Sequence, residues 1–142
     1  MTTHPSRLRT VSQRATPLLV LRVLLAAVLL NAGIGKYDGD AGPVETFDQV
    51  GLGQWFRYFI GTIEIASGAG LLIAPIAGLA AIAAGSVLIG AVAMEAFVLT
   101  DGTPITPAVL VALLALVAWC HRARTLALVT RALRISARRQ SS

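Results

Sequence analysis

Four long runs of apolar residues limit what this chain can fold into. They cover residues 17–35, 55–74, 76–99 and 107–119. A helix needs about 20 such residues to cross the roughly 30 Å hydrocarbon core of a bilayer, and the last run reaches this length only if residues 103–105 extend it. The runs are rich in Ala, Leu and Ile and lack the alternation of a membrane-barrel strand. We therefore predict an all-α fold, a bundle of four transmembrane helices.

The composition favours a membrane protein over a water-soluble one. Hydrophobic residues make up 56% of the 142 residues and charged residues 13%, and the mean hydropathy is +0.75. Soluble domains usually have about 45–50% apolar and about 25% charged residues. This high apolar content also excludes an intrinsically disordered chain.

The chain has few residues of the types that bind metals or redox groups. Cys120 is the single cysteine, which excludes an internal disulfide, a CxxC pair and a Cys-rich metal site. We place His4 and His121 outside the bundle at its cytoplasmic ends, which excludes a haem held by two histidines within the membrane. We therefore expect no metal and no resident cofactor, with a quinone as the one cofactor class left open.

Basic residues flank the first and last runs and predict the orientation of the chain. Three arginines precede the first run and six follow the last, namely Arg7, Arg9, Arg14, Arg122, Arg124, Arg131, Arg134, Arg138 and Arg139. The connection between the first two runs is acidic, so the positive-inside rule places both termini on the cytoplasmic side of the cell membrane. We divide the chain into a basic N-terminal segment (1–16), a transmembrane domain (17–120) and a basic tail (121–142).

The tail has the pattern of an amphipathic helix. Its arginines share one helical face and its apolar residues the other, the first group being Arg124, Arg131, Arg134 and Arg138 and the second Leu126, Val129, Leu133 and Ala137. Such a helix lies in the membrane interface. We predict that the arginines contact anionic lipid and that the net charge of +5 does not indicate a nucleic-acid partner.

Five charged residues lie within or beside the apolar runs, where an ionisable group costs about 2.5–3.5 kcal/mol to insert into lipid. They are Arg22, Lys36, Arg57, Glu64 and Glu95. Arg22 is placed near the cytoplasmic end, either reaching the headgroups or forming an ion pair, and the other four converge in the outer half of the bundle. Two interpretations stay open. These groups either satisfy one another and fix the helix register, or line an outward-facing pocket that binds a small polar headgroup or passes a proton through Glu64.

Small residues accompany these charges along the helix faces. On the second run, Arg57, Gly61, Glu64 and Gly68 follow one another at spacings of four, three and four, so they share a stripe. Glycines allow two helix backbones to approach closely, so the stripe predicts tight packing against another helix. Asn31 is predicted to point away from the charged face of the first run.

The aromatic residues and connections complete the prediction. We interpret Trp55, Tyr58 and Trp119 as anchors at the membrane interface, where amphipathic rings are enriched. The glycine-containing connection between the first two runs also holds apolar residues, so we expect a loop folded back onto the membrane surface. The tight connection at Pro75 makes the second and third helices antiparallel neighbours.

Three stretches of the chain share a pattern with a known family. The first helix reads LRVLLAAVLLNAGIGK, the following loop VETFDQVGLGQWFRYFIG and the second helix TIEIASGAGLLIAP. This pattern resembles the DoxX and DoxX-like membrane proteins over about residues 18–99, and the resemblance implies a four-helix membrane bundle. The matching positions are Arg22, Gly33, Lys36, Phe47, Gly51, Gly61, Glu64, Gly68 and Leu71. A histidine often stands near the end of the third helix in that family, where this chain has Met94 and Glu95.

The resemblance also implies a functional setting. Relatives include a subunit related to thiosulfate-to-quinone electron transfer and one associated with superoxide-detoxifying machinery. We therefore expect a non-catalytic accessory subunit of a redox or quinone-linked membrane complex. The alternative is a small proton-coupled transporter that uses Glu64. A stand-alone enzyme acting on a quinone or lipid is the weakest hypothesis, because the sequence supplies no nucleophile with its base, no phosphate loop and no metal cluster.

Overall fold

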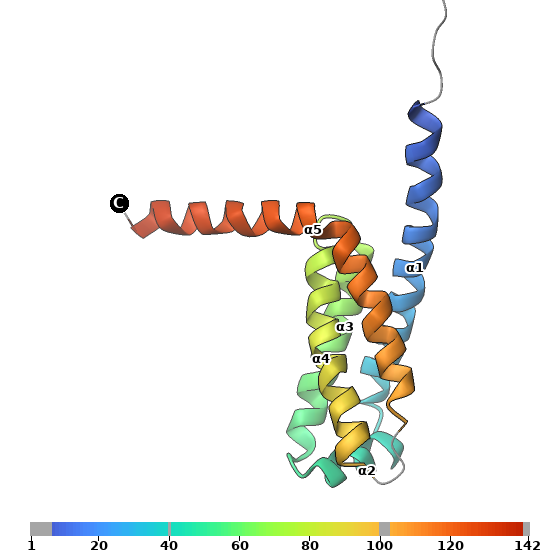
Figure 1. Ribbon diagram of the computed structural model, residues 1–142. Coiled ribbons are helices and arrows are strands. Elements are labelled where there is room, and N and C mark those ends of the chain that lie inside the picture. The colour runs from blue at the N-terminus through green and yellow to red at the C-terminus, as the bar shows by residue number, and fades with distance from the viewer. Residues whose placement is uncertain (1–6, 40, 100–102, 141–142) are drawn as a thin grey trace, which may run out of the picture.

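The protein is a bundle of helices with one helical arm (Figure 1). The computed structural model describes residues 7–39, 41–99 and 103–140. Within these ranges the chain forms five helices and no strand, which confirms the all-α prediction. The helices are α1 (Arg7–Gly35), α2 (Ala41–Val50), α3 (Gln54–Leu72), α4 (Ala77–Phe97) and α5 (Ile105–Gln140).

Four of the helices lie side by side along one direction. α1 packs on α3, α3 on α4, and α4 on α5. The short α2 crosses one end of the bundle, which we call the α2 end (Figure 1). At the opposite end α1 begins and α5 bends, so that its C-terminal part leaves the bundle as an arm. We call this the arm end.

Three helical segments are long and apolar enough to cross a bilayer. They are Pro17–Gly35 in α1, Ala77–Phe97 in α4 and Ile105–Ser136 in α5. The first two coincide with predicted runs, whereas the third extends far past the run predicted for residues 107–119. α3, which contains Arg57 and Glu64, is not among them.

The centre of the bundle is filled with small and branched apolar side chains. α4 contributes mainly alanines, which allow close packing against α3 and α5. The core residues are Leu25, Ala26, Leu29, Leu71, Ala80, Ala81, Ala84, Leu88, Leu114 and Val117. The outward faces are apolar as well, with exposed side chains such as Leu24, Ile82 and Leu116. A helical bundle that is hydrophobic on both its inner and outer faces is suited to lipid as its solvent.

The connection between α1 and α3 is not a simple loop as predicted, because residues 41–50 form helix α2. Val44, Phe47 and Val50 recur every three residues, which gives this helix one apolar side. Gly39 and Gly51 flank the helix with φ of 74° each. A residue with a side chain would be strained in this left-handed conformation, so glycine allows the chain to turn at both ends of α2.

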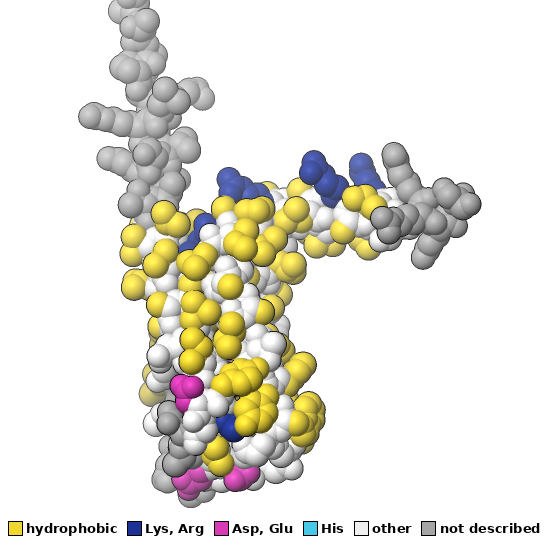
Figure 2. Space-filling model, turned by 180° about the vertical axis from the view of Figure 1, so that it is seen from behind, with side chains coloured by type: hydrophobic (Ala, Val, Ile, Leu, Met, Phe, Trp, Pro, Cys, Tyr) yellow, Lys and Arg dark blue, Asp and Glu magenta, His cyan; other side chains and the backbone are white. Residues whose placement is uncertain are grey.

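The basic tail is a direct continuation of α5, since the helix runs without interruption across residue 121. Figure 2 shows its Arg side chains on the side of the arm that points away from the bundle, with hydrophobic side chains on the side toward the bundle. Leu126 and Leu133 are each 64% exposed. Among its described residues, the arm therefore presents an exposed apolar face on the side toward the bundle.

Candidate polar pocket at the alpha2 end

Lys36, in the turn that follows α1, forms an ion pair with Glu64 of α3. The Lys36 Nζ lies 2.7 Å from the Glu64 Oε2, and the two side chains are only 16% and 6% exposed. Lys36 Nζ also donates to the Ala32 carbonyl at 3.4 Å. Glu64 is thus held inside the protein by a neighbouring helix and does not face lipid.

Glycines bring these two helices close enough for the pair to form. A Cβ atom on Gly33 would lie 2.9 Å from the Gly61 carbonyl oxygen, and one on Gly61 would lie 3.1 Å from the Gly33 carbonyl oxygen. A Cβ on Gly68 would lie 3.2 Å from the Ala26 carbonyl oxygen. The stripe predicted from sequence therefore packs against α1, and any side chain in its place would separate the backbones.

Arg57 is buried beside this pair but does not bind either acid. It is 3% exposed, and its Nε donates to Gln54 Oε1 at 2.7 Å. Its Nη2 donates to the Tyr58 hydroxyl at 2.9 Å, and its Nη1 donates to the Lys36 carbonyl. Arg57 therefore fixes the end of α1 against the start of α3, and it joins the predicted cluster only through the backbone of Lys36.

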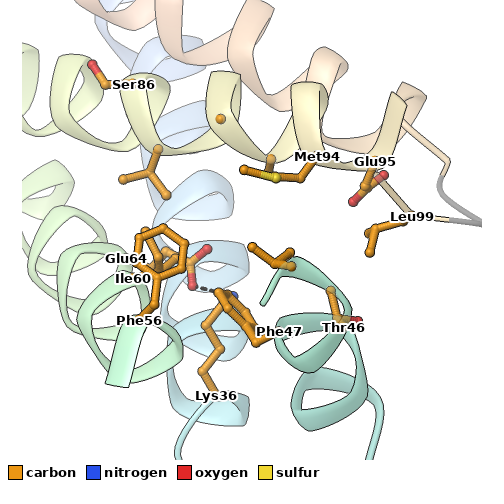
Figure 3. Close-up of a pocket in the computed structure, with 14 residues that line it drawn as sticks. Lys36, Thr46, Phe47, Phe56, Ile60, Glu64, Ser86, Met94, Glu95 and Leu99 are labelled. Atoms are coloured by element: carbon orange, nitrogen blue, oxygen red, sulfur yellow. Dashed lines mark hydrogen bonds and ion pairs between the residues drawn. The ribbon is translucent and has the colours of Figure 1, made fainter. Parts of the chain in front are cut away.

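A pocket of about 360 Å³ opens between α1, α2, α3 and α4. Figure 3 shows Lys36 and Glu64 on one side of it and Glu95, from α4, toward the other end. Most of its lining is apolar, and the full set is Lys36, Thr46, Phe47, Val50, Phe56, Ile60, Glu64, Ser86, Val87, Gly90, Ala91, Met94, Glu95 and Leu99. Such a volume is within the range of sites for small molecules.

The two hydroxyl groups that line the pocket are used by their own helices. Ser86 Oγ donates to the Ile82 carbonyl at 3.0 Å, and Thr46 Oγ1 donates to the Gly42 carbonyl at 2.9 Å. Neither hydroxyl is paired with a base. The polar chemistry of the pocket therefore comes from its three charged side chains, which suits recognition of a bound molecule.

Arg22 belongs to a different place in the bundle from the other four charged residues. It is 7% exposed near the arm end, and its Nε donates to the carbonyl of Leu71 at 2.7 Å. Leu71 is in the last turn of α3, where carbonyls lack helical partners and the helix dipole favours a cation. Among the residues that the structure describes, no acid pairs with Arg22. Arg22 is thus a cap for α3, a role distinct from the two considered above.

The three predicted interfacial aromatics are all exposed. Trp55 is 66% exposed and Tyr58 40% exposed at the α2 end, while Trp119 is 68% exposed toward the arm end. The guanidinium of Arg122 lies 4.0 Å from the centre of the Trp119 ring. Asn31 is also exposed, as predicted for a residue pointing away from the charged face of α1.

His121 is not outside the bundle, so that prediction is wrong. It is 5% exposed, and its Nδ1 lies 3.0 Å from the carbonyl oxygen of Val117. A Cβ on Gly78 would lie 2.9 Å from the His121 Cβ. The absence of a side chain on Gly78 thus makes room for His121 between α4 and α5. His4 lies outside the described residues, as do the side chains of Arg7, Arg9, Arg14, Arg138 and Arg139.

Several residues of the pocket were not found by sequence reasoning. Phe47 and Val50 line it because α2 folds over the end of the bundle, and Met94 lines it from α4. In the sequence, their apolar side chains cannot be distinguished from the many other apolar residues of the chain. The three-residue spacing of Val44, Phe47 and Val50 was the signal that could have identified α2 as a helix.

Comparison with known proteins identifies the family. The model of the DoxX-like family matches residues 20–117, which is more than half of the chain. The chain belongs to the DoxX-like family. No curated protein and no solved structure matched it. In this DoxX-like protein the matched region includes the ion pair, Arg22, Arg57, Glu95 and every residue that lines the pocket, whereas the arm lies beyond it.

Proposed function

We propose that this DoxX-like protein crosses the cytoplasmic membrane four times, with α3 as a span in addition to those in α1, α4 and α5. α3 has 19 residues, which gives a length of about 28 Å at 1.5 Å per residue. Its two charged residues, Arg57 and Glu64, are buried against other helices. Their charges therefore need not enter lipid. For this reason α3 can cross the membrane although its two charged residues lower its mean hydropathy.

The arm end is then cytoplasmic and the α2 end faces outward. The basic residues after the last span lie on the arm, and the exposed acids Asp38, Glu45 and Asp48 lie at the α2 end. This distribution follows the positive-inside rule. Labelling of single cysteines in a Cys120→Ala background tests it: Asp38→Cys should react with an impermeant reagent in intact cells, and Ser136→Cys should not. The opposite pattern would overturn the orientation.

The arm is proposed to lie on the cytoplasmic membrane surface and contact anionic lipid through Arg124, Arg131, Arg134 and Arg138. The exposed leucines on its other side support this arrangement, because burial of an apolar helix face drives interfacial binding.

Within the membrane, the protein is proposed to bind a small amphipathic molecule as a non-catalytic component. The observation that carries this proposal is the pocket of about 360 Å³, apolar in most of its lining and containing a buried ion pair. Membership of the DoxX-like family, with the redox association of its relatives, favours an accessory role in a redox or quinone-linked complex. A redox partner retained through purification in mild detergent would support that role, and a homogeneous single-component protein with unchanged respiration on deletion would refute it.

Tryptophan fluorescence offers a direct test of ligand binding. Trp55 contacts Phe56 with ring centroids 5.7 Å apart, and Phe56 lines the pocket. In a Trp119→Phe background, the remaining Trp55 emission should change saturably when neopentylbenzene, a small neutral hydrophobe, is added to protein in maltoside micelles. Gly90 lines the pocket and has open space around its Cα, so Gly90→Leu should fill the pocket and abolish the response.

Gly85 provides the matched control for this experiment. It also has open space around it but lies on the groove between α4 and α5 instead of the pocket. Gly85→Leu should therefore keep the fluorescence response. Survival of the response in Gly90→Leu would overturn ligand binding at this site, and so would the absence of a saturable response in the parent protein both to neopentylbenzene and to its charged analogue benzyltrimethylammonium.

The proton-coupled transporter is the second candidate, and burial of Glu64 favours it. The Lys36 ion pair favours a structural role for Glu64 instead, because the lysine already binds its carboxylate oxygen at 2.7 Å. Glu64→Gln in an otherwise unchanged strain should leave drug tolerance unaltered if the binding role is correct. A loss of tolerance with normal protein levels would favour the transporter.

A further inference from the structure

We propose that the pocket at the α2 end selects an amphipathic organic cation, a molecule with an apolar body and one ammonium group. This inference rests on the proposed ligand-binding function and specifies the chemical class of the ligand. It comes from three independent features of the site, namely its charge balance, its aromatic walls and the field of the surrounding surface.

The charge balance of the pocket leaves one negative group unopposed. Lys36 and Glu64 neutralise each other at 2.7 Å. Glu95 also lines the pocket, and in the part of the chain that the structure describes it has no ion pair or side-chain hydrogen bond. Three formal charges thus leave the lining with a net charge of minus one. A ligand with a single positive charge would complement it, and an anion would be repelled.

Two phenylalanines line the pocket, and neither is on α4, the helix that carries Glu95. Phe47 comes from α2 and Phe56 from α3, and their rings meet edge to face with centroids 5.8 Å apart. Figure 3 shows both rings bordering the cavity, with Glu95 on α4. The faces of aromatic rings attract cations within about 6 Å, most strongly where water is excluded. The walls thus offer an ammonium group favourable contacts besides the carboxylate.

The surface around the pocket has the same sign. At the α2 end the described acids are Asp38, Glu45, Asp48, Glu64 and Glu95, whereas the described bases are Lys36 and Arg57. Figure 2 shows acidic side chains gathered at this end and basic ones along the arm at the other. Clefts lined by one sign of charge concentrate ligands of the opposite sign. The protein would therefore enrich cations at the entrance to the site.

The apolar part of the ligand follows from the remaining lining. Val50, Ile60, Met94 and Leu99 present hydrocarbon and a thioether. A pocket of about 360 Å³ is near the lower end of the range for small-molecule sites. The ligand is therefore a compact molecule, such as a single ring with an attached ammonium group.

Benzyltrimethylammonium and neopentylbenzene make a matched pair of probes, because they differ in a nitrogen replaced by carbon and hence in charge. Both are titrated into the full chain with Trp119→Phe in maltoside micelles, with Trp55 fluorescence as the readout. We expect the cation to bind at least about tenfold more tightly than the neutral probe. Glu95→Gln should remove this preference and leave neopentylbenzene affinity unchanged. Glu45→Gln removes an exposed acid that contributes to the surrounding field but does not line the pocket, so as the control it should reduce the preference far less than Glu95→Gln does.

The outcomes separate the two proposals. If neopentylbenzene binds as well as the cation, or if Glu95→Gln keeps the preference, the cation inference is overturned while ligand binding stands. If neither probe binds, both fail. Dihexanoylphosphatidylcholine, which carries the same trimethylammonium group on a lipid, distinguishes the source of the ligand. Displacement of the probe by this lipid supports recognition of a headgroup, and no displacement supports a free cation.

Discussion

Breaking the Lys36–Glu64 pair from either side should have unequal effects. Lys36→Met leaves Glu64 unpaired, and the carboxylate is only 6% exposed, so water cannot replace the lysine. Removing one partner of a buried pair destabilises proteins by about 3–5 kcal/mol. Glu64→Gln leaves Lys36 with an amide oxygen to bind and, at 16% exposure, some access to water. We therefore expect a loss of about 1–2 kcal/mol for that variant.

The double variant Lys36→Met/Glu64→Gln gives the interaction energy itself. It leaves no unpaired charge, so its free energy of unfolding should fall by no more than that of Glu64→Gln alone. The coupling energy from the double-mutant cycle should therefore be at least as large as the loss in Lys36→Met alone, about 3–5 kcal/mol. Reversible unfolding in mixed micelles with sodium dodecyl sulfate, followed by circular dichroism, measures all four proteins.

Two results would refute this reasoning. Additivity of the two substitutions within about 0.5 kcal/mol would show that the two charges do not act as a pair. A larger loss for Glu64→Gln than for Lys36→Met would show that Lys36 is the less hydrated partner. Glu45→Gln is the control, and its effect should stay within about 0.5 kcal/mol because that side chain is exposed.

The same unfolding assay tests two other contacts. Gly33→Ala should cost about 1–3 kcal/mol because its Cβ would meet the Gly61 backbone, whereas Gly85→Ala should be neutral or stabilising by up to about 1 kcal/mol. Arg22→Met should cost about 1.5–3 kcal/mol through loss of a charged hydrogen bond to α3, and an unchanged stability would contradict its capping role. For the arm, replacing Arg131 and Arg134 with Gln should weaken its binding to anionic membranes about 30-fold, at about 1 kcal/mol per arginine. A fluorophore on Ser136→Cys in proteoliposomes, with Cys120→Ala, reports this binding, and equal binding in zwitterionic and anionic membranes would argue against it.

Much of the helical framework could be predicted because it depends on apolar runs and on small residues at helical spacing. Gly61 and Gly68 share a stripe with Glu64 whatever helix packs on them, so the sequence indicated burial of that acid. The partners of the charges were harder to predict. Arg22 and Arg57 both bind backbone carbonyls, of Leu71 and Lys36 respectively. Carbonyls are present at every residue, so sequence alone does not indicate which one an arginine meets.

The pocket itself depends on a tertiary arrangement that no local pattern contains. Glu95 was predicted to converge with the other charged residues in the outer half of the bundle, yet the pocket that it shares with Lys36 and Glu64 follows from how α4 and α2 close around α3. His121 shows the opposite error. Its place after the last apolar run indicated exposure, but the missing side chain of Gly78 creates a space that the ring fills.

The unbroken course of α5 has a practical consequence for shortening the protein. Gly78 packs against both His121 and Thr125, so residues 121–125 belong both to the bundle and to the segment that carries the arginines. Deleting everything after Cys120 would open a cavity beside α4 and remove the arm at the same time. A truncation intended to isolate the effect of lipid contact has to keep the chain through Thr125.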